Sequence, residues 1–222
     1  LRIAREGHAR GGKGEPKKTV KAYKLFRQKN GQLFPLFVNA DQPVETGKWL
    51  KAEAGPAGKT EGRVKSKIGD LAYRPGWHSG DLPIATHIGG KSKPDLTAPD
   101  YRPDDQVWAE VEHPADVDWQ KIANKRAEKT KAGAPIARTA HITDRVPYGG
   151  FYRYKTNPNM TGNWLISGDM KVNRLLSDDE VAAINDAAGV ADLPRLPRRG
   201  RKHGGKVHSG PIHSAVAGRT DH

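Results

Sequence analysis

Charge and apolar side chains are distributed so unevenly along this chain that only its middle can build a hydrophobic core. Residues 1–18 contain six basic and two acidic side chains, and residues 194–222 contain seven basic and one acidic. Together these ends carry most of the net charge of +13. Segments so charged and so poor in large apolar residues cannot bury enough surface to offset the entropy of ordering. We therefore expect a folded domain at residues 19–193 between extended basic arms at residues 1–18 and 194–222.

Basic arms beside a near-neutral domain favour a polyanion or an acidic protein surface as the partner. The alternative is that the charge only keeps two tails solvated. If the arms bind a partner protein or nucleic acid, their cations are the residues that do so. These candidates are Arg10, Lys13, Lys17, Lys18, Arg198, Arg199, Arg201, Lys202 and Lys206.

Between the arms, β-rich runs and helical patterns interleave without the regular alternation of a βαβ fold. Strands are expected at residues 20–26, 33–38, 71–74, 84–88, 107–112, 137–142, 151–155, 163–166 and 170–175. Helices are expected at residues 46–54, 118–131 and 178–188, the last opened by a capping box at Ser177 and Glu180. The turn residues Asn30-Gly31 and Ser167-Gly168-Asp169 predict two hairpins. The expected fold class is α+β, with a mixed or mostly antiparallel sheet and about three helices.

Several classes of chemistry find no support in the sequence. The chain has no cysteine, which excludes disulfides, thiolate catalysis and cysteine zinc sites. His78 and His87 are nine residues apart and no helix carries a histidine pair at i and i+4, so no metal site is expected. No phosphate-binding glycine loop is present, and no cofactor is expected. No apolar run is long enough to span a bilayer, so we expect no membrane partner and synthesis in a cytoplasm.

One stretch, Leu71 to Gly90, concentrates aromatic residues and histidines among glycines and prolines. With Arg27 before it and a Glu-x-Glu pair after it, the order of residues resembles the Arg, aromatic or Ser, and Glu order of ADP-ribosyltransferases. That resemblance implies a glutamate that stabilises developing positive charge on a ribose, and an arginine or histidine that holds the dinucleotide. The catalytic residues of this alternative are Arg27, His78, Glu110 and Glu112. The competing interpretation is that both glutamates simply face water on a half-exposed strand.

Aromatic and basic residues also alternate from residue 145 to residue 155. Such a mixture can stack on bases while it neutralises phosphates. Aromatic residues on a strand more often belong to the core, and the basic residues between them then face water. The residues concerned are Arg145, Tyr148, Phe151, Tyr152, Arg153, Tyr154 and Lys155.

Three segments carry a resemblance to known proteins: YRPGWHSGDLPIATHIGG, VWAEVEHPADVDW and GGFYRYKTNPNMTGNWLISGDMKVNRLLSDDE. The chain resembles segments of the long multi-domain proteins encoded by tailed double-stranded DNA bacteriophages, over about residues 19–222. This resemblance implies a phage context and assigns no catalytic residue. It also implies that Leu1 and His222 are internal boundaries of a longer polypeptide.

These observations predict a non-enzymatic, virion-associated structural protein of a tailed phage, made in the host bacterial cytoplasm. Its domain would dock on capsid, portal or tail proteins within a large assembly. Its arms would lie along neighbouring virion proteins or packaged phage DNA. The alternatives are an ADP-ribosyltransferase-like enzyme and a nucleic-acid-binding protein that acts in the infected cell.

Overall fold

Most of the regular structure is strand, as the β-rich runs predict. The structure is a computed structural model that describes residues 14–91, 100–127, 145–155 and 159–196 of the 222-residue chain. Its elements are β1 Thr19–Lys29, β2 Gln32–Phe34, β3 Trp49–Lys51, β4 Arg63–Ser66, β5 Gly69–Ala72, β6 Trp77–Gly80, β7 Gln106–Pro114, β8 Val117–Asp118, α1 Trp119–Ala127, β9 Gly150–Tyr154, β10 Trp164–Ser167, β11 Asp169–Leu175 and α3 Asp178–Ala187.

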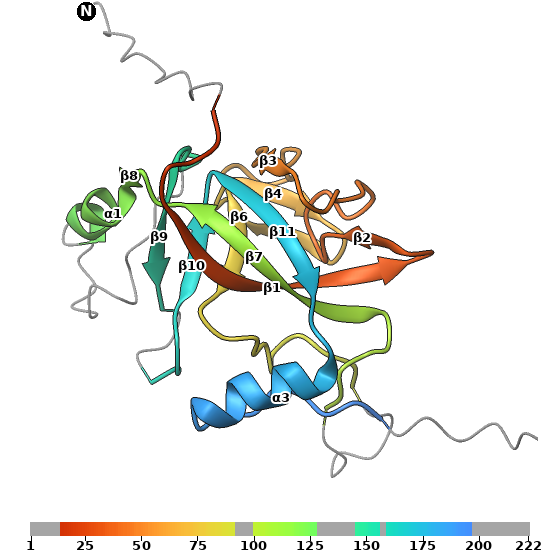
Figure 1. The fold of residues 1–222 in the computed structure, drawn as a ribbon. Coiled ribbons are helices and arrows are strands. Elements are labelled where there is room, and N and C mark those ends of the chain that lie inside the picture. Colours follow the sequence, from red (N-terminus) through yellow and green to blue (C-terminus); the bar gives the residue numbers. More distant parts are fainter. Residues whose placement is uncertain (1–13, 92–99, 128–144, 156–158, 197–222) are drawn as a thin grey trace, which may run out of the picture.

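Nine strands form one mixed sheet in the order β3-β11-β7-β1-β6-β10-β9-β8, and β2 pairs with β1 outside this path. β8 and β9 are parallel, and the other pairs are antiparallel. The longest ladder joins β1 to β7, from Thr19 opposite Pro114 to Arg27 opposite Gln106. β4 and β5 form a separate hairpin (Figure 1). The expected α+β class with a mixed sheet is confirmed.

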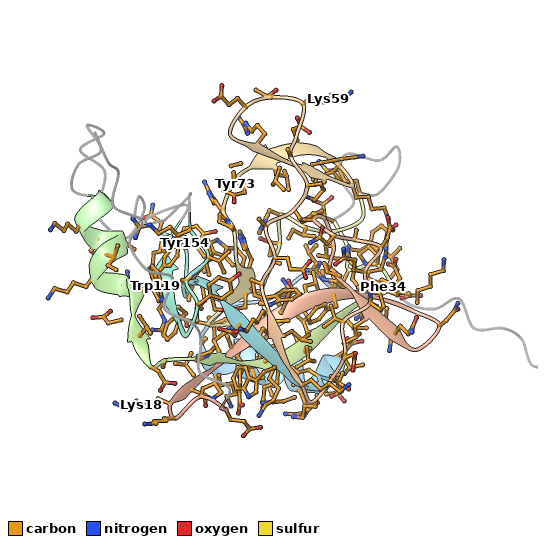
Figure 2. All side chains as sticks on the ribbon, turned by 90° about the horizontal axis from the view of Figure 1, so that it is seen from above. Lys18, Phe34, Lys59, Tyr73, Trp119 and Tyr154 are labelled. Carbon is orange, nitrogen blue, oxygen red and sulfur yellow. The ribbon has the colours of Figure 1, made fainter. Side chains whose placement is uncertain are left out.

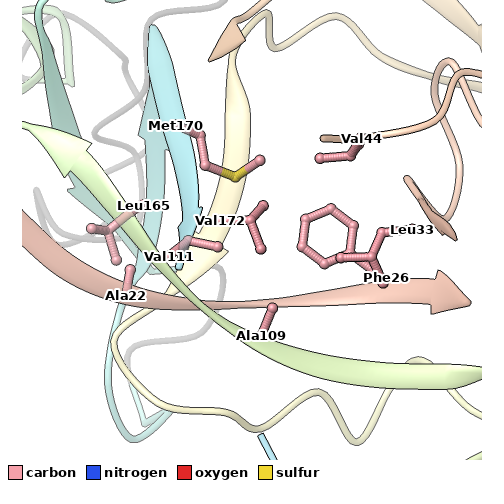
Figure 3. Packing of buried hydrophobic residues seen from close by; sticks show 9 residues of the cluster. All are labelled: Ala22, Phe26, Leu33, Val44, Ala109, Val111, Leu165, Met170 and Val172. Carbon is pink, nitrogen blue, oxygen red and sulfur yellow. The ribbon is translucent and has the colours of Figure 1, made fainter. Parts of the chain in front are cut away.

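The sheet buries apolar side chains on both faces, because successive residues of a strand point to opposite sides. On β1, Ala22 and Phe26 join the cluster drawn in Figure 3, whereas Tyr23 and Leu25 pack on the other face. The Figure 3 cluster consists of Ala22, Phe26, Leu33, Val44, Ala109, Val111, Leu165, Met170 and Val172.

The two described helices belong to the opposite face. α1 packs on β9 and contributes Ala123, and α3 contributes Val181 beneath β1 and β7 (Figure 1). The capping box of α3 is confirmed: the Ser177 hydroxyl accepts from the Glu180 N–H, and the Glu180 carboxylate accepts from the Ser177 N–H. Gly189, at φ 68°, follows the helix end as expected.

A third expected helix, at residues 46–54, is wrong. Trp49–Lys51 is instead β3, which pairs with β11 at the edge of the sheet. The chain just before β3 is also extended, because Thr46 forms an isolated β-bridge with Val172. Pairing with the sheet therefore outweighs the local helical pattern. The described residues contain two helices, and the end of the helix expected at 118–131 lies outside them.

The hairpin at Asn30-Gly31 is confirmed, with φ values of 51° and 75° that suit a tight turn between β1 and β2. The hairpin expected around Gly168 is wrong in its pairing. Both strands exist, but β10 pairs with β6 and β9, whereas β11 pairs with β7 and β3. The strand expected at 84–88 is wrong, since this segment contains a turn at residues 86–87 and no strand, and the one expected at 137–142 lies outside the described residues.

Candidate functional site

The N-terminal arm is attached to the domain at one end of β7. The backbone N–H groups of Lys17 and Lys18 donate to the carboxylate of Asp116 over 3.1 and 3.0 Å. The Ala115 N–H donates to the Lys18 carbonyl over 2.8 Å. Because backbone groups make these bonds, the side chains of Lys17 and Lys18 stay exposed and available to a partner. Arg10 and Lys13 lie outside the described residues.

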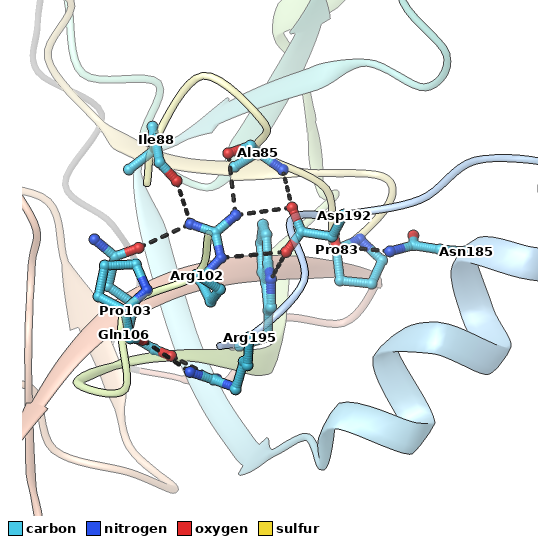
Figure 4. A network of polar contacts seen from close by, with 10 residues as sticks. Pro83, Ala85, Ile88, Arg102, Pro103, Gln106, Asn185, Asp192 and Arg195 are labelled. Carbon is cyan, nitrogen blue, oxygen red and sulfur yellow. Dashed lines mark hydrogen bonds and ion pairs between the residues drawn. The ribbon is translucent and has the colours of Figure 1, made fainter. Parts of the chain in front are cut away.

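The segment that leads to the C-terminal arm is held by a buried ion pair between Arg102 and Asp192 (Figure 4). Arg102 is 2% exposed, and its Nη2 donates to Asp192 over 2.8 Å. Asp192 also accepts from Trp108 Nε1 over 2.8 Å and from the Ala85 N–H over 2.9 Å. A buried ion pair is tolerated only when hydrogen bonds complete it, and these contacts complete it.

Arg195 fixes the same segment to the far end of β7. Its guanidinium donates to the Pro103 and Gln106 carbonyls over 2.8 and 2.7 Å, and to both oxygens of Asp178 over 2.8 and 2.9 Å. Arg198, Arg199, Arg201, Lys202 and Lys206 lie outside the described residues.

A pocket of about 260 Å³ lies between α3 and residues 191–195. Its lining residues Arg102, Asp192, Asp178 and Arg195 are already paired with one another, so their charges are neutralised within the protein. None of these four charged side chains therefore needs a charged ligand in the pocket as a partner.

The centre of the Leu71–Gly90 stretch gathers three basic groups around β6. The Lys24 ammonium donates to the His78 carbonyl over 2.6 Å and lies 5.8 Å from the centre of the Trp77 ring. His78 Nε2 lies 2.8 Å from the Arg74 carbonyl, so this nitrogen carries the proton. Within the described residues, none of the three side chains is ion-paired with a carboxylate. Lys24 and Arg74, the two of these groups that are charged near pH 7, are therefore the ones that could contact an anionic partner.

The pKa values of Lys24 and His78 are both lowered in this arrangement. Desolvation lowers the pKa of Lys24 to about 8. Although the His78 side chain is exposed, desolvation by the surrounding protein and the positive charges of Lys24 and Arg74 lower its pKa to about 4. Both groups lose their proton more readily than usual, mainly because desolvation disfavours their charged forms.

Behind this cluster lies a buried Ser-His-Ser network. His113 is fully buried; its Nε2 is 2.7 Å from Ser79 Oγ and its Nδ1 is 2.5 Å from Ser167 Oγ. Ser167 Oγ donates to the Asp169 carbonyl over 2.9 Å. A nucleophilic serine needs access to its substrate and a basic partner. Burial instead denies access and lowers the pKa of His113 to about 4, so the network joins β6, β7 and β10 structurally.

The residues of the ADP-ribosyltransferase alternative are spread along the sheet. Arg27 donates to the Ala40 carbonyl over 2.8 Å and lies opposite Gln106, four residues from Glu110 along β7. Glu110 lies near Lys21 and Arg174, at 3.8 and 3.6 Å, and Glu112 is paired with Lys171 at 2.9 Å. The structure does not bring Arg27, His78 and these glutamates to one point.

The aromatic residues from 145 to 155 belong largely to the core. Tyr152 and Tyr154 are 0% and 5% exposed and pack with Ala123 and Ile166. Tyr148 is exposed, and its hydroxyl donates to the Ala52 carbonyl over 3.1 Å. The alternation of aromatic and basic residues therefore reflects a strand with one buried face. It does not form a row of exposed rings on which bases could stack.

Sequence reasoning did not single out Lys24, Arg102, His113 or Asp192. Lys24 had a readable signal, because it alternates with Ala22 and Phe26 on an otherwise apolar strand face. Arg102 and Asp192 had none, since they are ninety residues apart.

Searches among known proteins found no matching family model, no matching curated protein and no matching solved structure. Among the residues that the structure describes, no helix has the length and apolar character needed to cross a membrane. No group of three or more acidic or histidine side chains in that part of the chain is placed to hold a metal ion.

Proposed function

We propose that the chain is a virion-associated structural protein of a tailed phage, without enzymatic activity. Its α+β domain docks on capsid, portal or tail proteins, and its basic arms lie along neighbouring virion proteins or packaged phage DNA. The phage context is the one implied by the three segments YRPGWHSGDLPIATHIGG, VWAEVEHPADVDW and GGFYRYKTNPNMTGNWLISGDMKVNRLLSDDE.

One observation supports this proposal above the others: the arms join the domain at opposite ends of the β1–β7 ladder. The N-terminal arm is bonded beside Pro114 through Asp116, and the C-terminal segment is bonded at Gln106 through Arg195. The eight residue steps between Pro114 and Gln106 span about 26 Å at about 3.3 Å per residue. Two basic arms that start this far apart can reach separate partners at the same time.

Arms of this kind suit a role in assembly. They add contact area without a hydrophobic core of their own, and the stems of Lys and Arg cover apolar surface while their charged ends meet acidic groups. The anchoring bonds of Asp116 and Asp192 fix where each arm begins, so an arm loses less freedom when it binds.

Mass spectrometry of purified phage particles tests the proposal. We expect the chain, or a longer product that contains it, in particles at a fixed ratio to the major structural proteins. Its absence from particles, with the protein abundant in infected cells, would favour the nucleic-acid-binding alternative. A salt titration of its release then separates the two kinds of partner, since contacts to phosphates weaken steeply with salt and apolar docking does not.

A further inference from the structure

The β4–β5 hairpin carries a group of exposed cations on a short, rigid support. β4 and β5 pair from Arg63 opposite Ala72 to Ser66 opposite Gly69, and residues 67 and 68 form the connecting turn. The hairpin belongs to the two-stranded sheet and not to the nine-stranded one. In Figure 2, Lys59 marks the outer end of the loop that precedes β4, at the edge of the molecule.

The hairpin is firmly attached to the body. Val64 is buried, and its neighbour Gly55 approaches so closely that an added Cβ would lie 2.5 Å from the Val64 side chain. The Lys65 N–H donates to the Pro56 carbonyl over 2.9 Å, and the Lys67 N–H donates to the Phe37 carbonyl over 3.0 Å. The backbone is therefore bonded on the inner side, and it presents its outer side chains at fixed positions.

Four cations on this element are exposed: Lys59, Arg63, Lys65 and Lys67. Because Arg63 and Lys65 are two residues apart on one strand, they share a face at about 6.6 Å spacing.

Within the described residues, none of these four cations is ion-paired. The nearby Asp70 carboxylate is occupied by the backbone N–H groups of Lys59 and Thr60, at 2.6 and 3.2 Å. Glu61 is the other acidic residue of this element, so the excess charge is positive.

The tip of the hairpin is apolar. Ile68 is 66% exposed, the most exposed large hydrophobic residue of the described chain. The Ser66 hydroxyl fixes the turn by donating to the Gly69 carbonyl over 2.5 Å and accepting from the Ile68 N–H over 3.2 Å. An isoleucine held out beyond a row of cations can make apolar contact with thymine methyl groups in the major groove.

We propose that the β4–β5 hairpin is a docking element for double-stranded DNA. A two-stranded β-ribbon fits the width of the major groove, and cations along its face can reach the phosphates on either side. Stacking on single strands needs exposed aromatic rings, and residues 63–72 contain none. This places a duplex contact on the folded domain itself, apart from the arms, and it stands whether or not the protein enters the virion.

The test measures binding of the full chain to a fluorescently labelled 20-base-pair duplex at several salt concentrations. The triple variant Arg63→Gln, Lys65→Gln and Lys67→Gln removes three cations from the hairpin. The control variant Lys29→Gln, Lys121→Gln and Lys125→Gln removes three exposed cations elsewhere that are not ion-paired in the described structure. Both variants lose the same net charge, so a difference in their duplex affinity reflects where the removed cations lie.

We expect the hairpin variant to lose at least about tenfold in duplex affinity and its log–log salt slope to fall by about 2 to 3, at about 0.9 per lost phosphate contact. The control should keep nearly the wild-type slope. Ile68→Ser should weaken duplex binding at an unchanged slope, since it removes no charge. Circular dichroism confirms that each variant is folded.

Equal losses in the hairpin and control variants would overturn the proposal, because binding would then depend on net charge alone. A hairpin variant that loses affinity for a single strand of the same length as strongly as for the duplex would also overturn it. Presence of the protein in particles bears on the proposed function and leaves this result unaffected.

Discussion

Asp192 and Arg102 are separated by ninety residues in the chain, yet Asp192 Oδ1 lies 2.8 Å from Arg102 Nη2 with both side chains withdrawn from water. This pair closes the C-terminal segment over the loop around Ala85 and Ile88, and the loop carbonyls complete the bonds of the guanidinium. The beginning of the basic C-terminal arm is thus fixed by a charge pair inside the domain.

Asp192→Asn should therefore destabilise the domain by about 3 to 5 kcal/mol, because it leaves the buried Arg102 charge without its partner. Urea denaturation at pH 7 measures the loss. Asp186→Asn is the matched control, since Asp186 is exposed on α3 and is not ion-paired in the described structure; it should change stability by less than about 0.5 kcal/mol. Equal effects of the two substitutions would contradict a structural role for the pair.

Acidification should destabilise the domain through His113. Desolvation lowers its pKa in the folded state to about 4, whereas an unfolded histidine titrates near 6.5. Between these values the unfolded state binds the extra proton, so stability is complete above about pH 6.5 and falls as the pH drops toward 4. The total loss is about 3 kcal/mol at 1.36 kcal/mol per pKa unit.

Urea denaturation at pH 7.5, 6.5 and 5.5 checks this dependence. His113→Asn should be less stable than the wild type at pH 7.5, and it should lose the part of the pH dependence that lies between 6.5 and 5.5. His78→Asn is measured in parallel, because the pKa of His78 is also lowered to about 4 and the two histidines contribute to the pH dependence in the same range. If His113→Asn kept the full wild-type slope in this range, another group would be responsible.

Gly168→Ala should be strongly destabilising. A Cβ at this position would lie 2.3 Å from Tyr148 Cα and 2.4 Å from Tyr148 N, and backbone atoms cannot move aside as a flexible side chain can. We expect a loss of about 3 kcal/mol, visible as a lower melting temperature. Gly14→Ala, where no atom lies within 4 Å of the added Cβ, should be nearly neutral. A mild effect at Gly168 would mean that the two chain segments do not pass this closely.

Ser177→Ala should cost about 1 kcal/mol, because it removes the acceptor for the Glu180 N–H at the start of α3. Ser177→Asp should restore most of this loss, since an aspartate can accept the same bond and carries a charge favourable to the helix N-terminus. Chemical denaturation distinguishes the two variants. An aspartate as damaging as the alanine would show that the hydroxyl acts in another way.

Local signals predicted the local features of this fold. The positive φ at Asn30-Gly31 and the capping box at Ser177 depend on neighbouring residues only, and both are confirmed. The alternation from 107 to 112 likewise predicted β7, whose Ala109 and Val111 face one core cluster.

Long-range pairing was not predictable in the same way. The helix expected at residues 46–54 included Trp49 and Leu50, and only the partner strand β11 makes them extended. Local turn residues predict a hairpin at Gly168, and the sequence does not reveal that Tyr148 passes beside it. Of the candidate site residues, Lys17 and Lys18 are described and exposed, whereas the cluster of Lys24, Arg74 and His78 forms only when β1 meets β6.

The positions at which the arms join the β1–β7 ladder determine how the domain would respond to mechanical load. The chain from the C-terminal arm runs back through α3 to Leu175 of β11, so tension on the two arms would pull Thr19 of β1 and Leu175 of β11 in opposite directions along the strands, on either side of β7. Ladder hydrogen bonds run perpendicular to the strands, so this force would shear all the pairs together rather than unzip them one at a time. If the domain linked two moving parts of an assembly, its longest strand ladder would therefore be the last part of it to break under load.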